Sequence, residues 1–422
     1  MTATAEAGAR IATLDIVRGV AVMGILAMNI ADFALPSPAY INPVAYGNEG
    51  PADLVSWAFG FILFDGKMRG LFSFLFGASM LLVIEGAEEK GERSAAVHLR
   101  RMAWLGLIGL LHYYLIWHGD ILFGYAVAGA VAWFFHARSP KSLVRIGIGF
   151  IALQFLIFAA LAGAIFFLAS AAAEPGASAQ TLGAWSGKQN MFGAGTPEHL
   201  REQLTRLGGS WTSIAGHRLT AEAGGPFLGL FFFSWETIGY MLFGMAALKT
   251  GFLAGAWEPA RYRRIAAWCL GLSLAVYALY AALMIGGGFR VTDVAAYWFA
   301  GTVPIRPLAV IGAAALIILL VRPGAFLSDR IAAAGRTAFT NYLGTSILMT
   351  TLFYGYGFGL FGDLRRVELW LVVAAMWALM LLWPKPWLER FRYGPLEWLW
   401  RSLARWSPQP MRRLPPGTGA AG

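Results

Sequence analysis

Polar residues in the first apolar segment are the clearest candidates for chemistry in this chain. Residues 11–33 read IATLDIVRGVAVMGILAMNIADF, which is apolar enough to cross a bilayer but contains Asp15, Arg18 and Asn29. Hydrocarbon solvates such groups poorly. Asp15 and Arg18 are three residues apart and can pair on one helix face. Asn29 returns to within about 20° of the azimuth of Arg18, roughly 16 Å further along the axis.

This polar stripe has two interpretations. In the first, Asp15 and Arg18 hold helix ends together and Asn29 hydrogen-bonds a neighbouring helix. In the second, the stripe lines a site that has a cation near one membrane surface and a neutral amide near the other. A simple anchor helix needs neither group.

Two histidines and one acid follow in the third apolar segment and the turn after it. His112 lies eleven residues after Arg101, the spacing already seen in the first segment. An imidazole within the membrane is a candidate general base, because its unperturbed pKa lies near neutrality. His118 and Asp120 stand at the outer end, where Asp120 can orient an imidazole. The alternatives are a neutral His112 that bonds a neighbouring helix, and exposed interfacial residues at 118 and 120.

Arginines gather at the segment ends that we place on the cytoplasmic side. One arginine in such a position usually anchors topology, but several together can bind phosphates. The predicted phosphate-binding residues are Arg18, Arg100, Arg101 and Arg336.

Other polar groups are candidates for binding a substrate. Lys67 and Arg69 stand beside a glycine-bounded break at 65–70, at the predicted outer interface, where they can bind an anion or snorkel to water. In the ninth apolar segment, hydrogen-bonding groups follow an arginine within a turn and a half of helix. The candidate substrate-binding residues read in this way are Asp15, Lys67, Arg69, Thr340 and Asn341.

Composition places the chain among multi-pass membrane proteins. Of its 422 residues, 58% are hydrophobic and only 13% are charged, too few to cover a soluble body of this size. The net charge of +10 lies in short loops and the C-terminal tail, so it indicates topology rather than nucleic-acid binding. The single Cys269 excludes a disulfide framework and a cysteine metal site. Phosphate-binding loops, metalloprotease histidine pairs and serine-hydrolase elbows are absent, so we expect no metal and no tightly bound cofactor.

The alternation of apolar segments and basic loops predicts an all-α protein of about ten transmembrane helices, with both termini cytoplasmic. A short interfacial or re-entrant helix ending at Phe64 precedes the second helix. Pro304 and Pro307 should kink the eighth. The expected helices cover residues 11–33, 67–85, 102–117, 121–135, 146–169, 226–248, 265–286, 295–321, 333–354 and 367–383.

We expect one transmembrane domain, residues 1–393, followed by a basic, tryptophan-rich cytoplasmic tail, residues 394–422. Such a tail suits the headgroup region of membrane lipids. The outer loop 170–225 should contain an amphipathic helix from Pro197 to Leu207. This loop is either a lid over an outward-facing cavity or a connector.

Several separated blocks resemble the YeiB-like bacterial membrane proteins of unknown function. The blocks are Arg10-Ile11, LDIVRGVA at 14–21, GILAMN at 24–29, LFSFLFG at 71–77, Arg100-Arg101 leading to His112, GDIL at 119–122 with Tyr125, Gly335-Arg336 with TNY at 340–342, and GPLEW at 394–398. They extend from near the N-terminus into the tail. The resemblance adds Tyr125 to the candidate substrate-binding residues.

The opening block also resembles the first helix of membrane acyltransferases, including the acyltransferase-3 proteins and the lysosomal heparan glucosaminide acetyltransferase. In the acyltransferase-3 pattern a histidine follows the arginine by eleven positions, where this sequence has Asn29. The lysosomal enzyme has asparagine there and a histidine in the following loop. This sequence has no histidine between Asn29 and Lys67, so His112 and His118 are the remaining candidate bases.

The resemblance implies a transmembrane acyltransferase with acyl-CoA as co-substrate and a small-molecule or envelope-glycan acceptor. The arginines would hold donor phosphates, Asn29 would bond the thioester carbonyl or position the acceptor, and His112, or His118 with Asp120, would manage the acceptor proton. A transporter or exporter of a small anionic or amphipathic solute would use the same charges as a substrate path. A sensor or envelope partner that kept the fold without catalysis is a third possibility.

Overall fold

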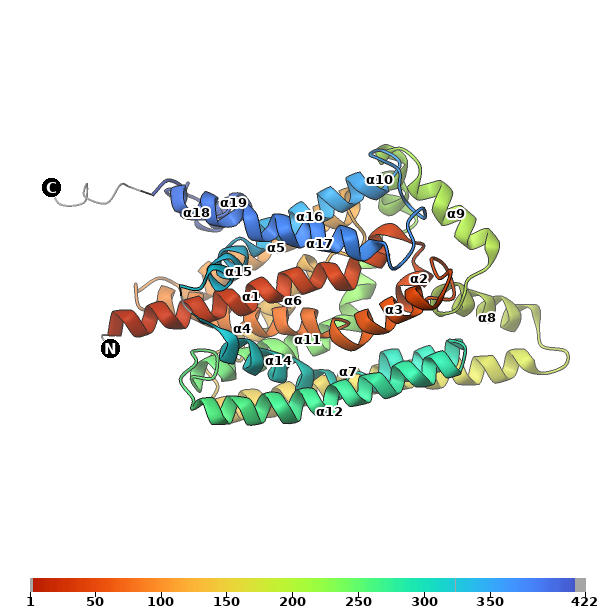
Figure 1. Cartoon of the computed structure of the whole chain (residues 1–422), viewed down its shortest axis with the longest axis horizontal. Coiled ribbons are helices and arrows are strands. Elements are labelled where there is room, and N and C mark those ends of the chain that lie inside the picture. Colours follow the sequence, from red (N-terminus) through yellow and green to blue (C-terminus); the bar gives the residue numbers. More distant parts are fainter. Residues whose placement is uncertain (1–2, 323, 414–422) are drawn as a thin grey trace.

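Long helices run side by side along the length of the molecule (Figure 1). The computed structural model describes residues 3–322 and 324–413, with side chains from Thr13 onward. Within these residues every regular element is a helix, apart from an isolated bridge between Phe391 and Arg412. The predicted all-α class is therefore confirmed.

Helix α1 (Ala3–Ala34) lies at the centre of the bundle and packs against α4, α15, α16 and α17. Glycines bring α1 and α15 (Phe326–Arg336) into backbone contact. A Cβ added to Gly19 would lie 2.1 Å from the carbonyl oxygen of Ile331, and one added to Gly335 would lie 1.8 Å from that of Asp15. Only glycine allows this approach, which places the polar residues of α1 directly against α15.

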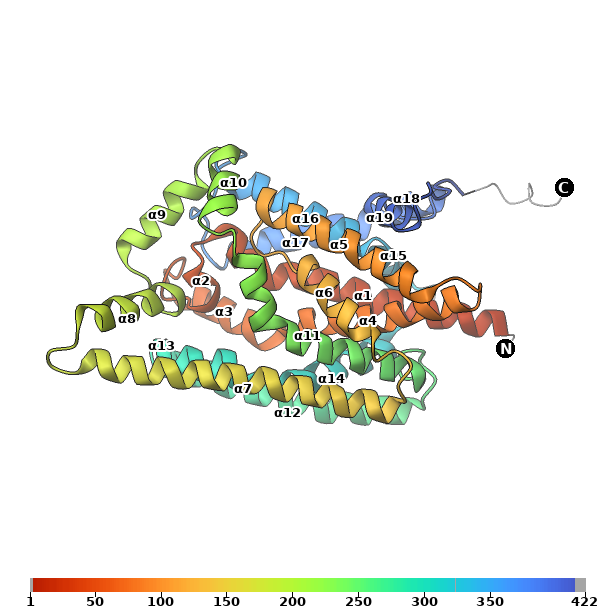
Figure 2. The same ribbon diagram turned by 180° about the vertical axis from the view of Figure 1, so that it is seen from behind.

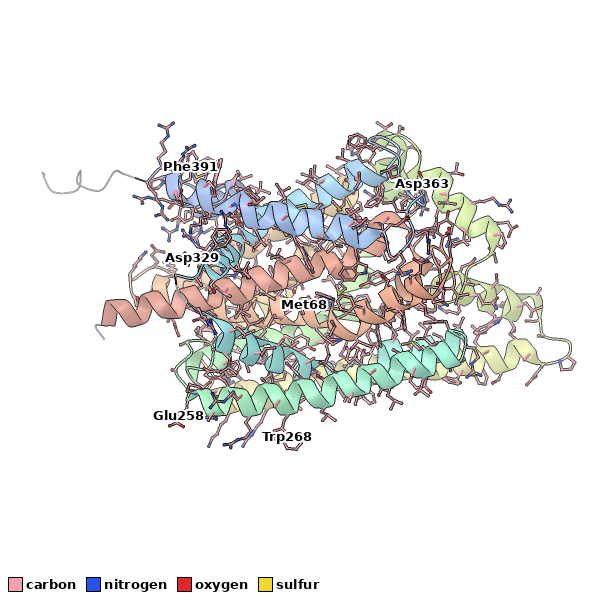
Figure 3. All side chains as sticks on the ribbon, viewed as in Figure 1. Met68, Glu258, Trp268, Asp329, Asp363 and Phe391 are labelled. Carbon is pink, nitrogen blue, oxygen red and sulfur yellow. The ribbon has the colours of Figure 1, made fainter. Side chains whose placement is uncertain are left out.

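Helices α3 (Pro51–Leu63) and α4 (Lys67–Glu88) form one candidate span of 38 residues, broken at Gly66. The expectation of a short helix ending at Phe64 and a second starting at Lys67 is confirmed, but its location at the outer interface is wrong. Gly24, in the middle of α1, faces Met68. Met68 also lies midway along the molecule in Figure 3, between Asp329 and Asp363. The break is therefore at mid-depth.

Two long helices, α7 (Pro140–Ala173) and α12 (Pro259–Gly286), cover one face of the bundle (Figures 1 and 2). Their apolar side chains point outward, and Phe167 and Trp268 are 78% and 76% exposed. Figure 3 shows Trp268 projecting from this face. Water would solvate such a surface poorly, whereas lipid covers it without cost. The protein is accordingly a multi-pass membrane protein.

Helix boundaries in the first half differ modestly from the expected ones. Helix α5 (Ser94–Leu115) begins eight residues early, so Arg100 and Arg101 lie within a helix instead of a loop. Helices α6 (Leu122–Trp133) and α11 (Gly225–Lys249) lie close to the ranges expected for them.

The eighth predicted helix is broken, as its prolines indicated. A short helix α13 (Val291–Asp293) continues into the wider turns of η1 (Val294–Gly301), and α14 (Arg306–Leu320) follows at 54° to them. Pro304 lacks the backbone N–H that would continue the helix, and Pro307 lies at the start of α14, where its fixed φ is favourable.

The outer loop is more helical than expected. The amphipathic helix α9 (Pro197–Leu207) is confirmed residue for residue, but α8 (Ala179–Phe192) and α10 (Trp211–Thr220) accompany it. All three begin at a Ser or Thr whose hydroxyl accepts a backbone N–H bond. A further short helix, α2 (Pro38–Ile41), lies in the loop after α1.

The ninth predicted helix is divided at Thr337 into α15 and α16 (Ala338–Phe353), and α17 (Leu369–Leu382) follows. Helix α18 (Pro384–Arg390) follows directly, and the predicted tail contains α19 (Pro395–Arg405). Helix α19 packs against α5 and α16. The last part of the predicted tail, 414–422, lies outside the described residues.

Among the described residues, six helices are long and apolar enough to cross a membrane, or seven if the bent pair is one span. Figures 1 and 2 place the start of α1 and the helices α18 and α19 at the same end of the molecule, which we name the terminal end. The opposite end, formed by α8, α9 and α10, is the loop end.

Candidate functional site

A buried histidine–carboxylate pair joins α5 to the start of α6. Nδ1 of His112 lies 2.8 Å from Oδ2 of Asp120, and the two side chains are only 1% and 2% exposed. Oδ1 of Asp120 accepts a hydrogen bond from the backbone N–H of Phe123, at the N-terminal turn of α6. The aspartate is thus held by both helices and directs the imidazole ring.

The other ring nitrogen of His112 is free. Its Nε2 is buried and has no hydrogen-bond partner among the described residues. When the N–H of Nδ1 donates a hydrogen bond to the carboxylate of Asp120, Nε2 carries the lone pair, which is the tautomer a general base needs. A buried polar atom without a partner is uncommon and calls for a ligand or a functional role. The ring lies beside Tyr342 and Trp117, with centroids 5.4 and 6.3 Å away.

Asn29 lines a pocket that those same two aromatic residues share. Its side chain is 8% exposed, and its amide makes no hydrogen bond with any residue that the structure describes. Residues of α1, Trp117, and Tyr342, Thr345 and Ser346 of α16 form the pocket walls. Trp117 and Tyr342 thus connect the Asn29 pocket to the His112–Asp120 pair, which does not itself line the pocket. We refer to Asn29, His112 and Asp120 as the histidine–amide site.

The third candidate, His118, lies in the same neighbourhood with a different partner. Its Nε2 is 3.2 Å from Oδ2 of Asp32, near the end of α1, and its side chain is 29% exposed. The preceding Trp117 stacks on Phe33 at 3.9 Å between ring centroids. Asp120 therefore orients His112 and not His118, which narrows the two alternatives that the sequence left open.

A second polar centre, which the sequence analysis missed, lies where the break between α3 and α4 meets the break before α14. Glu236 of α11 accepts hydrogen bonds from Nη1 of Arg306, at 2.7 Å to each carboxylate oxygen, and from Nη2 of Arg69. Its side chain is 1% exposed. Lys67 is also buried; its Nζ donates to the carbonyl oxygens of Phe61 and Asp65. We call Asp65, Lys67, Arg69, Glu236 and Arg306 the ionic cluster.

The ionic cluster corrects the placement of Lys67 and Arg69. Both side chains lie in the interior, midway along the bundle, where they bond to buried groups. They lie there because the break at Gly66 lets α4 begin halfway along the span. Gly66 has φ of 64°, and a Cβ there would lie 2.1 Å from Nε of Arg306. The signal that could have revealed the cluster was one acid and one arginine within otherwise apolar stretches, Glu236 and Arg306.

Arginines converge at the terminal end. Arg18 bonds Oδ1 of Asp15 at 2.7 Å through Nη1 and Oγ of Ser79 at 2.7 Å through Nη2. Arg336 is exposed and lies within electrostatic range of Asp15. Arg401 of α19 lies within range of Arg18, and also of Arg101.

Arg101 and Arg100 point to different partners. The guanidinium of Arg101 stacks 4.1 Å above the ring of Trp400, whose indole N–H donates to the carbonyl of Arg101. Arg100 bonds the backbone of its own helix at Ala96. Three of the four predicted phosphate-binding arginines thus lie in one network, and α19 adds a fourth member, Arg401.

The remaining candidates bond within the protein. The amide of Asn341 bridges the break between α15 and α16, donating to the carbonyl of Ala334 and accepting from Trp383. Thr340 donates from its hydroxyl to Glu397 of α19. Burial raises the pKa of Glu397, although its hydrogen bonds oppose this.

Tyr125 lies beside the ionic cluster. Its hydroxyl is 2.6 Å from Oγ of Ser73 and donates to the carbonyl of Arg69.

Comparisons of the amino-acid sequence with known proteins identify relatives of this chain. Residues 247–407 match the family described as "Protein of unknown function (DUF418)". The chain is 32% identical over 405 residues to the uncharacterized protein YeiB of Escherichia coli K12, covering 93% of this chain and 95% of YeiB. It is 32% identical over 422 residues to the uncharacterized protein YxaH of Bacillus subtilis 168, covering 96% of each. An uncharacterized 39.9 kDa protein of Bacillus acidopullulyticus is 26% identical over 396 residues, covering 93% of each.

Proposed function

Because this chain belongs to the family of YeiB and YxaH and carries the DUF418 region, we propose its function from the sites that its own residues form. We propose a transmembrane acyltransferase that moves an acyl group from a cytoplasmic acyl-CoA to an acceptor at the outer face. The observation that carries the proposal is the buried His112–Asp120 pair with its free Nε2, whose ring lies beside Trp117 and Tyr342, two walls of the Asn29 pocket.

Each residue of the histidine–amide site has a role in this reaction. The acceptor hydroxyl or amine attacks the carbonyl carbon of the thioester while Nε2 of His112 takes its proton. The amide N–H of Asn29 donates to the oxyanion that develops on the carbonyl. The C–S bond then breaks, and the imidazolium returns the proton to the departing thiolate. Asp120 holds the ring in the required tautomer and stabilises the imidazolium.

The arginine network at the terminal end could bind the acyl-CoA donor. Arg18, Arg101, Arg336 and Arg401 would bind the phosphates of CoA by charge-assisted hydrogen bonds. Arg18 and Asn29 are on one helix about 16 Å apart along its axis. Phosphates at the terminal end and a thioester at Asn29 therefore fit one extended donor. A small molecule or an envelope glycan would be the acceptor.

This proposal includes a topology of ten crossings in the inner membrane with both termini cytoplasmic. The seven candidate spans, counting the bent pair as one, together with α5, α6 and the α15–α16 pair, give ten. The common location of the start of α1 and of α19 supports an even number of crossings (Figure 1).

The test is incubation of the purified protein in lipid nanodiscs with acetyl-CoA labelled on the acetyl group. We expect saturable donor binding and slow thioester loss, and we expect the thioester loss to fall sharply in Asn29→Ala and His112→Ala. His136→Ala, which lies outside the site, is the matched control. If neither short nor longer acyl donors bind or turn over, acyl transfer is wrong for this chain.

A transporter is the second candidate, and the two helix breaks favour it. Gly66 between α3 and α4 lies against Arg306 at the start of α14, so both discontinuous helices meet at the ionic cluster. Broken helices that meet at mid-depth are the usual substrate site of secondary transporters. This reading predicts solute flux in proteoliposomes without a covalently changed product. Flux abolished by Glu236→Gln, with acyl-CoA turnover absent, would favour it.

A further inference from the structure

One face of α5 is left uncovered by the described residues. Leu107 and Leu111 on this face are 46% and 50% exposed. Seven residues of helix at about 100° each bring Arg100 to within about 20° of the azimuth of Leu107, and Trp104 to within about 20° of that of Leu111. A cationic group and an apolar stripe therefore lie on the same side of one helix.

Helix α19 lies next to this face at the terminal end (Figure 2). Trp406, its C-terminal cap, is 69% exposed, and its indole meets that of Trp104 edge to face, with 5.7 Å between ring centroids. Trp406 has φ of 53°, a left-handed conformation that glycine and asparagine adopt more readily. Exposed tryptophans in such a position are typical of the boundary between lipid and water.

Two arginines flank this pair of indoles. Arg100 lies one helical turn before Trp104, and Arg405 lies next to Trp406, so the contact between the indoles brings both arginines to one region. Neither arginine forms an ion pair with any residue that the structure describes. Nε of Arg100 donates to the backbone of its own helix, but its two Nη nitrogens have no partner in the described chain. These nitrogens are free to bind a ligand.

The neighbouring cations add to the positive charge. Arg101 lies within electrostatic range of both Arg401 and Arg405, so these cations repel one another. Glu397 is within range of Arg401, but its carboxylate accepts hydrogen bonds from Thr340 and from the backbone of α16. Positive charge is thus in excess beside the exposed face of α5, and the group that complements it is an anion such as a phosphate.

The length of the exposed face matches one leaflet of a bilayer. Eleven residues of helix separate Arg100 from Leu111, which is roughly 16 Å along the axis. The hydrocarbon core of a bilayer is about 30 Å thick, so one leaflet is about 15 Å deep. A lipid with its headgroup at Arg100 would therefore cover Leu107 and Leu111 with its acyl chains. A soluble phosphate would cover neither leucine, so the face favours a lipid.

We propose that the exposed face of α5 and the end of α19 bind one anionic phospholipid. Its phosphate accepts hydrogen bonds from Arg100 and Arg405, its glycerol backbone lies on the two indoles, and its acyl chains lie along the two leucines. We call these residues the lipid strip: Arg100, Trp104, Leu107, Leu111, Arg405 and Trp406. The inference does not rest on acyl transfer, because the proposed donor site uses neither Arg100 nor Arg405.

A pair of double variants separates the lipid strip from the overall charge of the protein. Arg100→Gln with Arg405→Gln removes both headgroup cations and keeps polar side chains in their place. Arg263→Gln with Arg264→Gln is the matched control. It removes the same charge from exposed positions at the start of α12, which lies at the terminal end but away from α19 (Figures 1 and 3).

The experiment is native mass spectrometry of the whole protein in a non-ionic detergent, titrated with phosphatidylglycerol or with phosphatidylcholine of the same acyl chains. We expect the first phosphatidylglycerol to bind at least about tenfold more tightly, a difference of 1.4 kcal/mol. This preference should fall below about threefold in the lipid-strip variant and remain in the control. Glycerol phosphate, which carries the charge without the acyl chains, should not displace the bound lipid.

Four results would overturn the inference. Equal affinities for the two lipids would mean that the arginines select no anion. A preference that survives in the lipid-strip variant, or falls equally in the control, would reflect overall charge. Displacement by glycerol phosphate would mean a site for a free phosphate. A dimer in the same spectra that is lost in Leu107→Gln would mean that a second copy of the chain covers this face. Thermal unfolding of each variant distinguishes lost binding from lost folding.

Discussion

At the scale of single residues, some buried polar side chains of this protein have hydrogen-bond partners and others do not. Thr340 and Asn341 use their side chains to hold neighbouring helices together. His112 and Asn29 retain atoms with no partner in the described protein. Because an unpaired buried polar group costs stability, these atoms are the first that we test for a role in binding or catalysis.

The carboxylate of Asp120 provides the sharpest test at this scale. Asp120→Asn keeps the size of the side chain but favours the wrong imidazole tautomer at His112. We expect acyl-CoA turnover to fall by about 10³–10⁴-fold with donor binding unchanged. The measurement is thioester loss together with equilibrium binding of the donor. Asp32→Asn, which removes the partner of His118, is the control; an equal loss there would mean that His118 is the base.

Glu236 tests the ionic cluster. Glu236→Ala leaves Arg69 and Arg306 buried without their shared carboxylate, so we expect a loss of about 3–5 kcal/mol in the free energy of unfolding. Thermal unfolding in nanodiscs measures it. Glu258→Ala, at an exposed position at the start of α12 (Figure 3), should change stability by less than about 0.5 kcal/mol. Equal effects of the two substitutions would contradict a mid-depth ionic cluster.

At the scale of elements, breaks in the helices determine where the polar groups lie. Gly66 divides α3 from α4, Pro304 precedes α14, and Thr337 separates α15 from α16. Each break frees backbone groups that must then find partners within a membrane. Lys67 donates hydrogen bonds to two such carbonyl oxygens, and Asn341 donates to another. The polar side chains that looked like ligand sites are in part the compensation for these breaks.

The contact between α1 and α15 predicts a strong dependence on one glycine. Gly335→Ala would push the backbone of α15 away from Asp15, and we expect a loss of about 1–3 kcal/mol in the free energy of unfolding. It should also weaken donor binding, because Arg336 would move with α15. Gly344→Ala in α16, where the added Cβ meets nothing within 4 Å, should be neutral or stabilise by up to about 1 kcal/mol. Urea or thermal unfolding of both variants measures the free energy of unfolding. An unchanged free energy in Gly335→Ala would contradict the backbone contact between α1 and α15.

At the scale of the whole molecule, the two ends have different characters. The terminal end collects α19 and the arginine network, whereas the loop end is covered by α8, α9 and α10 (Figure 1). Excess positive charge beside a membrane span faces the cytoplasm in most bacterial membrane proteins. The asymmetry supports an orientation with the donor site inside and the loop helices outside.

Cysteine labelling tests that orientation. The chain has a single cysteine, so Cys269→Ala provides a background without thiols. In it, Glu198→Cys on exposed α9 should react with a membrane-impermeant maleimide in intact cells. Ser407→Cys, exposed beside α19, should react only after lysis. The opposite pattern would reverse the proposed topology, and labelling of both in intact cells would mean an even number of crossings between residues 198 and 407, which contradicts the proposed topology.

The sequence by itself determined the membrane class, the all-helical fold, the helix breaks at Gly66 and Pro304 and the polar stripe of α1. These are local properties, because apolar run length, proline and glycine act on the residues beside them. Only the tertiary structure decided which polar groups meet. It paired Asp120 with His112, moved Lys67 and Arg69 from the interface into the interior, and joined Arg69 to Arg306 through Glu236. Arg69 and Glu236 are 167 positions apart and come from different helices, and no spacing along the chain encodes such a contact.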